Sequence, residues 1–242
     1  MDQAVDADLL RLAIGIEVVE QRVELVHGRD AVALATILRS TRATDRRLQR
    51  VVRVEVGLHQ EELEFGRHHG LPTVGGIEVE HARKTAELAG TLFDSMKPLH
   101  GLPPSCGKLL EAAAHLADIG HYVSDMGHHR HSHYLVSNAD LPAFTAEERE
   151  IVAQLCRFHR RSMPAARHVF FQKLAPATQR QILRMIPLLR LADALDRSHE
   201  QRVEDLEVEL QGKKTVIALS SGAGMNLEIW AGERAGEVFR EV

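Results

Sequence analysis

Histidine is concentrated in one part of this 242-residue chain. Six of its fifteen histidines lie between positions 115 and 133, in the segments 115–121 (HLADIGH) and 128–134 (HHRHSHY). An imidazole ring can bind a transition metal, contribute to an anion-binding surface when protonated, or belong to a solvated helix face. The cluster therefore indicates a metal site, a phosphate-binding surface or a polar helix face.

A second pattern extends these histidines into a candidate metal-ligand set. Five successive predicted helices each carry one histidine or aspartate within an otherwise apolar stretch. Imidazole and carboxylate ligands together suit iron, manganese, zinc or magnesium, and two adjacent cations can activate water and hold a phosphoryl group. Each residue alone could equally be a buried polar side chain that a neighbouring helix satisfies. As a set we expect them to bind a divalent metal ion, with Asp118 also catalytic: His81, Asp118, His131, His159 and Asp193.

The helices that would position these residues can be read from hydrophobic periodicity. Apolar residues recur near helical spacing in 79–96 and in the alanine- and leucine-rich segment 108–121. A shorter helix is expected over 131–138, where Asn138 would end it.

Two further helices are expected before residue 201. In the segment 141–162, Thr145 followed by Glu148 has the spacing of a capping box at a helix start. The segment 175–200 is a long helical pattern that Pro187 should kink or restart, because proline lacks the amide hydrogen that continues a helix.

The last forty residues change character. Alternating apolar residues in 206–210, a turn at 211–214 and the segments 215–219 and 225–230 predict three short antiparallel strands, closed by a helix over 231–242. The fold class expected is therefore mainly α, with a helical domain at 71–200 and a small α+β module of three strands and a helix at 201–242.

The first seventy residues give a weaker pattern. They fit a small α/β or helical subdomain, with a short strand suggested by alternating valines at 52–56. A run of arginines at 42–53 is read as a solvated helix face or, alternatively, as an anion-binding or partner surface.

Composition excludes several classes of function. The net charge of −4 argues against a DNA-binding protein, so any anion site must be local. No apolar run is long enough to cross a membrane, and the acidic N-terminus differs from a signal peptide. The two cysteines, Cys106 and Cys156, form no zinc-binding or disulfide pattern. We therefore expect a cytoplasmic protein.

The order of the candidate ligands resembles the HD superfamily of metal-dependent phosphohydrolases, whose ligands follow the order His, His-Asp, Asp. The segments 109–164 and 188–210 are similar to one branch of it, the C-terminal HD-like module of the exopolyphosphatase/guanosine-pentaphosphate phosphatase family. The runs GHHRHSHYL, SNADLPAF and RFHRR carry this similarity together. The resemblance covers about residues 72–242 and implies a divalent cofactor: Mn, Fe, Zn or Mg.

Two departures from that family limit what the resemblance implies. Its members begin with an actin-like phosphatase domain, whose glycine loops are absent from these 242 residues. In addition, Ala117 stands where the histidine of the HD pair is expected, and alanine cannot bind a metal ion.

Neighbouring histidines could replace the missing ligand. Successive helical residues are about 100° apart, so His121 would lie about 40° from Ala117 on the same helix face, and His115 about 160° away. His121 could reach the site if the helix continues through Gly120, and His128 and His129 are further candidates. His133 is expected to be peripheral.

Four arginines lie beside the histidines and could bind phosphate groups through paired N–H donors, although a solvated basic face is the alternative: Arg130, Arg157, Arg160 and Arg161. We therefore expect an HD-type phosphohydrolase-like protein that acts on or binds polyphosphate or a nucleotide. The alternative is a non-catalytic module that binds polyphosphate, a guanosine alarmone or a partner protein, and a homodimer is consistent with either.

Overall fold

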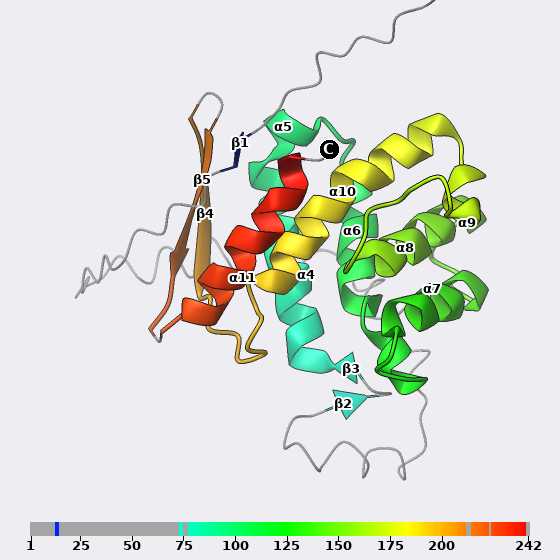
Figure 1. Cartoon of the computed structure of the whole chain (residues 1–242), viewed down its shortest axis with the longest axis horizontal. Helices are drawn as coiled ribbons and strands as arrows, with labels where there is room; N and C mark the ends of the chain where they lie inside the picture. Colours follow the sequence, from blue (N-terminus) through cyan, green and yellow to red (C-terminus); the bar gives the residue numbers. More distant parts are fainter. Residues whose placement is uncertain (1–12, 15–72, 75–76, 212–213, 223, 241–242) are drawn as a thin grey trace, which may run out of the picture.

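The computed structural model describes residues 13–14, 73–74, 77–211, 214–222 and 224–240 (Figure 1). Most of the predicted N-terminal segment 1–70, including its arginine run, lies outside these residues. The described elements follow in chain order: β1 (Ala13–Ile14), β2 (Thr73–Val74), β3 (Ile77–Glu78), α4 (Val79–Ser95), α5 (Lys97–His100), α6 (Ser105–Leu116), η2 (Ile119–Tyr122), α7 (His128–Asn138), α8 (Ala146–Phe158), α9 (Val169–Gln172), α10 (Pro176–Ala194), β4 (Asp205–Gln211), β5 (Lys214–Ser220), α11 (Asn226–Gly236) and η3 (Glu237–Arg240).

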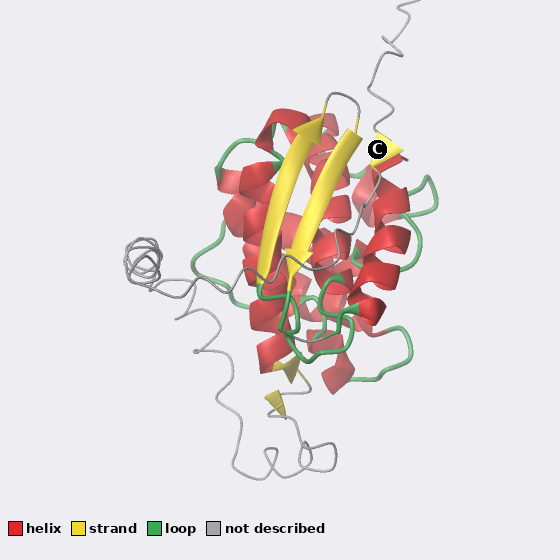
Figure 2. Ribbon diagram, turned by 90° about the vertical axis from the view of Figure 1, so that its left-hand side faces the viewer, coloured by secondary structure: helices red, strands yellow, loops and turns green. Residues whose placement is uncertain are grey.

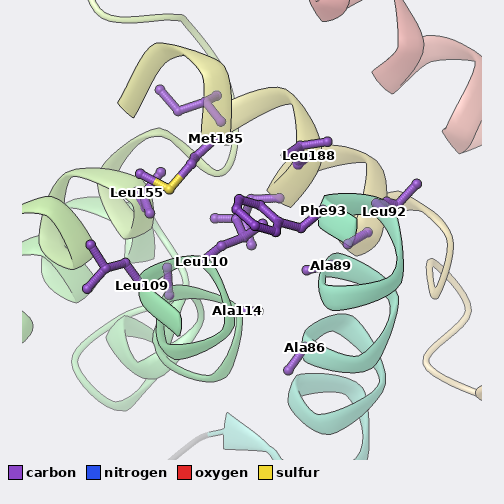
Figure 3. Close-up of a cluster of buried hydrophobic side chains, with 14 of the residues drawn as sticks. Ala86, Ala89, Leu92, Phe93, Leu109, Leu110, Ala114, Leu155, Met185 and Leu188 are labelled. Atoms are coloured by element: carbon purple, nitrogen blue, oxygen red, sulfur yellow. The ribbon is translucent and has the colours of Figure 1, made fainter. Parts of the chain in front are cut away.

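Helices α4, α6, α8 and α10 pack around one apolar core (Figure 3). Leu92, Leu110, Leu155 and Leu188 come from these four helices and are at most 1% exposed. Full burial of a leucine side chain contributes about 1.5–3 kcal/mol. The core therefore fixes the helices, and their ends carry the candidate site.

Local sequence signals explain several helix boundaries. The Thr145 side chain accepts the backbone N–H of Glu148, and the Glu148 side chain accepts that of Thr145, so the predicted capping box is confirmed. Helix α10 begins with Pro176, which lacks the amide hydrogen that would be unpaired at that position. It continues through Pro187 up to Ala194.

The connection between α5 and α6 is fixed by a buried histidine. His100 donates from Nε2 to the carbonyl of Phe93 (2.7 Å), and its Nδ1 accepts the backbone N–H of Leu102 (3.0 Å). Burial is the main cause of a lowered pKa at His100. The ring therefore serves as a neutral bridge between two backbone groups.

The C-terminal module contains an antiparallel pair that lies against the helices (Figure 2). β4 and β5 pair from Asp205 opposite Ser220 to Gln211 opposite Lys214, and β4 contacts α4. β1 adds to β5 in parallel. The mainly α fold with a small C-terminal α+β module is therefore confirmed.

One element of that module differs from the prediction. Residues 225–230, expected as a third strand, instead lead into α11, which packs on α10. Leu227 and Ile229 alternate like strand residues, but so short an apolar pattern also fits a helix. The buried positions of α11 include Glu228, Ala231 and Gly232, and their spacing is helical.

The segment that follows α6 leaves the helix just before the site. α6 ends at Leu116, and η2 follows Asp118, so the helix does not continue through Gly120. Gly120 is buried against α7: its N–H donates to Ser132 Oγ (2.9 Å), and Ser132 Oγ donates to the carbonyl of Ala117 (2.6 Å). These bonds fix Asp118 and His121 relative to α7.

None of the helices in the described ranges combines the length and apolarity that a membrane crossing requires.

Candidate metal centre

Asp118 is the residue on which the candidate centre converges. Its Oδ1 lies 3.3 Å from Nε2 of both His128 and His159, and 3.7 Å from Nε2 of His121. This oxygen is buried and has no hydrogen-bond partner among the described residues. A buried carboxylate oxygen needs a hydrogen-bond donor or a cation as a partner. Among the described residues, Asp118 Oδ1 lacks such a donor.

The other nitrogen of each ring shows why these histidines face Asp118 with Nε2. Nδ1 of His159 is 2.7 Å from the carbonyl of Cys156, and Nδ1 of His128 is 3.3 Å from the carbonyl of Asp125. Nδ1 of His121 is 2.7 Å from Asp125 Oδ1. Because these oxygens only accept hydrogen bonds, each Nδ1 donates to them, and Nε2 is the nitrogen of each ring that faces Asp118.

Nε2 atoms that converge on an anionic oxygen need a proton or a cation between the nitrogen and the oxygen. A second-sphere acceptor on Nδ1 is also the arrangement that orients histidines toward metal ions. The arrangement around Asp118 Oδ1 therefore fits a metal ion, which would also satisfy this oxygen.

His81 occupies the opposite side of Asp118. Its Nε2 lies 3.8 Å from Asp118 Oδ2 and 3.4 Å from Asp193 Oδ1, and its Nδ1 lies 2.8 Å from Asp196 Oδ2. Asp118 therefore presents one oxygen to His81 and the other to the remaining histidines.

Burial and charge set the protonation of this region. Burial opposes a charge on His81, but hydrogen bonds with Asp193 and Asp196 outweigh it and raise its pKa to about 10. Burial also opposes ionisation of Asp118, yet the hydrogen bond and electrostatic interaction with His159, followed by the interactions with His81 and His128, hold the pKa of this carboxyl well below its usual range. The pKa of Asp193 is lowered as well, because the hydrogen bond with His81 outweighs its burial.

His128 differs from His81 in its charge. Burial, with further contributions from His121 and His159, lowers its pKa to about 4, although Asp118 acts in the opposite direction. His128 is therefore neutral at pH 7 and able to bind a metal through Nε2.

Among the residues that the structure describes, two groups have ligand atoms close enough to hold a metal ion. The first contains His81, Asp118 and Asp193, and the second contains Asp118, His121 and His128, with all ligand atoms of each group within 4.8 Å of one another. Helix ends bring them together: His81 lies in the first turn of α4, Asp193 near the end of α10, and His128 at the start of α7. Asp118 belongs to both groups.

The predicted ligands are distributed unequally around these groups. His159 lies 3.3 Å from Asp118 and from His128, although it belongs to neither three-residue group. His129 is buried and lines the adjacent pocket. His131 is half-buried on α7 and belongs to neither group nor to the pocket lining.

The positions of Ala117 and His121 follow from the end of α6 at Leu116. Ala117 is 5% exposed, and its carbonyl accepts Ser132 Oγ. His121 reaches the group that contains His128, whereas the group of His81 has a single imidazole. His133, expected to be peripheral, contacts Glu150 and Gln154, which belong to neither group.

A pocket of about 320 Å³ opens beside the second group. Two of the four predicted phosphate-binding arginines, Arg160 and Arg161, line it, and Arg160 Nη1 lies 3.5 Å from Nε2 of His128. Arg130 is exposed and Arg157 half-buried, and neither lines the pocket. The remaining pocket residues are His121, Asp125, Gly127, His128 and His129.

Arg157 nevertheless lies in the electrostatic surroundings of the pocket. Its pKa is lowered by burial and then by the charges of Arg130 and Arg167. Arg157 and Arg161 also help burial to lower the pKa of His129 to about 4. Positive charge therefore surrounds this end of the site.

Sequence reasoning missed three contributors. Asp125 and Asp196 hold the Nδ1 atoms of His121 and His81. His199 stacks on His81, with ring centroids 3.9 Å apart. The spacing of Asp193 and Asp196 was available as a signal, but only the fold shows which histidine Asp196 meets.

Comparison with known proteins gives a consistent family assignment. A family model described as Ppx/GppA phosphatase, domain III, matches residues 71–229, which is more than half of the chain. A guanosine-5'-triphosphate,3'-diphosphate pyrophosphatase of Vibrio vulnificus (strain YJ016) is 25% identical over 167 residues, covering 68% of this chain. The chain spans about a third of that relative's length (33%). The resemblance inferred from the sequence is confirmed, and the chain belongs to the Ppx/GppA phosphatase family through its domain III.

Proposed function

We propose that this chain carries an HD-type, metal-dependent phosphohydrolase-like site for a phosphate-rich ligand, either polyphosphate or a nucleotide. The observation that carries the proposal is the buried Oδ1 of Asp118, which has no hydrogen-bond partner among the described residues and on which Nε2 atoms of His121, His128 and His159 converge. Membership of the Ppx/GppA phosphatase family and the name of the Vibrio vulnificus relative support a phosphate-containing ligand.

The chain's own residues suit a divalent cation. His81 and Asp193 would hold one ion with Asp118, and His121 and His128 a second, with His159 adjacent. When bound, manganese, iron, zinc or magnesium would lower the pKa of a water molecule and neutralise phosphate charge. Asp118 would bridge both positions, which is the role we assign to it in catalysis.

The arginines would bind the phosphate groups. Arg160 and Arg161 line the pocket beside His128, and a guanidinium group donates paired N–H bonds to phosphate oxygens. Arg130 and Arg157 lie outside the pocket lining and would meet the more distant phosphates of a longer ligand.

A metal and activity analysis tests this proposal. Protein purified without chelator should contain a divalent metal ion, and it should hydrolyse a nucleotide or polyphosphate. The variant Arg160→Ala should weaken phosphate-chain binding, while Arg180→Ala, on the exposed side of α10, serves as the matched control. Absence of both metal and hydrolysis would contradict the enzymatic function.

Ala117 favours a second candidate function. Because this position cannot supply a ligand, the group of His81 has one imidazole, and the chain could bind polyphosphate, a guanosine alarmone or a partner protein without catalysis. A homodimer would be consistent with such a module. The variant Ala117→His separates the two functions: raised metal content together with new or increased hydrolysis would indicate a weakened enzyme site. Ligand binding without hydrolysis in both proteins would indicate a binding module.

A further inference from the structure

The loop after α10, residues 196–201, encloses the ring of His81. Asp196 is fully buried (0% exposed), and its Oδ2 lies 2.8 Å from His81 Nδ1. Its Oδ1 accepts the backbone N–H of Gln201 (2.8 Å), and Gln201 Nε2 donates to Oδ2 (3.3 Å). The hydrogen bonds that the Asp196 carboxylate accepts therefore come from His81 and from Gln201 of the same loop.

The same loop also contacts the face of the His81 ring. His199 stacks on it with 3.9 Å between centroids and 8° between planes, and His199 Nδ1 contacts Glu78. His199 and Gln201 both have positive φ, 58° and 51°, although neither is glycine. Such conformations are unfavourable for residues with side chains and persist where the surrounding contacts impose them.

We propose that Asp196 is a positioning residue which, with His199 and Gln201, holds His81 so that only Nε2 faces Asp118 and Asp193. This inference rests on the proposed function, because the ligand of that group is a divalent cation. The orientation has particular weight in this chain, since His81 is the single imidazole of its group and Ala117 offers no second one.

The hydrogen-bond donors around Asp196 determine what the substitution Asp196→Asn would do. Its two oxygens accept from three N–H groups, on His81 and Gln201. In Asp196→Asn one oxygen becomes an NH₂ group. If the NH₂ faces His81, Nδ1 must accept instead of donate, so the remaining ring proton is held on Nε2, which then cannot bind a metal. If it faces Gln201, two donors oppose each other and the loop must move.

Metal titration of chelator-treated protein tests this by isothermal calorimetry with Mn²⁺. The His128→Ala background removes a ligand of the second group, so that binding at the group of His81 is measured. Adding Asp196→Asn should weaken that binding by about 10–100-fold, the usual effect of removing an outer hydrogen-bond partner of a ligand. Asp140→Asn, an exposed residue, is the matched control and should leave it unchanged. Equal affinity with and without Asp196→Asn would overturn the proposal.

Nitrogen-15 NMR of histidine-labelled protein gives a reading that does not depend on the metal. The Nδ1–H of His81 should be protected from solvent exchange in the wild-type protein and in Asp140→Asn. In Asp196→Asn this proton should be lost or should lose its protection, because either Nδ1 accepts or the loop moves. Wild-type protection of this proton in folded Asp196→Asn would overturn the positioning role. If the wild-type protein binds no cation but shows the protected proton, the proposed function fails while the role of Asp196 stands.

Discussion

Gly120 allows a direct test of how the backbone shapes the candidate centre. In Gly120→Ala, the new Cβ would lie 2.0 Å from the carbonyl oxygen of His128, 2.5 Å from the amide nitrogen of Ser132 and 2.7 Å from its Oγ. Real Cβ contacts almost never fall below 3.0 Å, so η2 and the first turn of α7 must separate by about 1 Å.

The energetic cost follows from the contacts that this separation disturbs. Overpacking a well-packed site costs about 1–3 kcal/mol. The hydrogen bonds from Gly120 to Ser132 and from Ser132 to Ala117 would weaken, at about 1 kcal/mol each. We therefore expect a loss of about 3–5 kcal/mol, a large part of the roughly 5–15 kcal/mol that stabilises a typical domain.

Urea denaturation and calorimetric metal titration measure the two consequences. We expect the free energy of unfolding to fall as stated, and metal affinity to fall by about tenfold or more, since His128 moves away from Asp118. Gly90→Ala is the matched control: apart from the backbone of its own helix and its chain neighbours, no atom lies within 4 Å of its new Cβ, and alanine in a helix should stabilise α4 by about 0.5–1 kcal/mol. Wild-type stability and metal affinity in Gly120→Ala would refute the reasoning.

Three further perturbations have defined outcomes. Asp118→Asn should abolish Mn²⁺ binding at both donor groups, because its carboxylate belongs to both; calorimetry that still shows wild-type binding would contradict the shared role. Thr145→Ala removes a capping box and should lower the free energy of unfolding by about 1 kcal/mol, measured in urea, with no change in metal affinity. His100 has a lowered pKa in the folded protein, so below about pH 6.5 the unfolded chain binds more protons than the folded protein. The free energy of unfolding therefore decreases as the pH is lowered through this range. Denaturation at pH 7.5 and 5.5 should therefore show the stability advantage of wild type over His100→Asn shrinking at the lower pH, and a constant difference would refute this assignment.

Local signals in the sequence were sufficient to predict helices such as α4 and α8. The apolar periodicity of 79–96 predicted α4, and Thr145 with Glu148 predicted the start of α8, because capping and amphipathic packing depend on residues three or four positions apart. The family could also be inferred, since its motifs are continuous stretches of chain. The segment 225–230 was mispredicted because a short apolar alternation fits both a strand and a helix until its packing partner, α10, is known.

The candidate centre was predictable in part. His81, Asp118 and Asp193 could be proposed as metal ligands from their order and type, and the structure places them in one group. His131 could be proposed on the same grounds, but it lies in neither group, because the side chains that leave α7 toward Asp118 depend on where that helix begins.

The sequence by itself determined which residue types are available: the histidines, the aspartates, the flanking arginines and the alanine at position 117. Tertiary structure alone decided how they are paired. It ended α6 before Gly120, so that His121 joined His128, and it brought Asp196 to His81 across 115 positions of sequence. The physical reason is that ring orientation depends on the acceptor at the second ring nitrogen, and that acceptor is supplied by whichever segment the fold packs beside it.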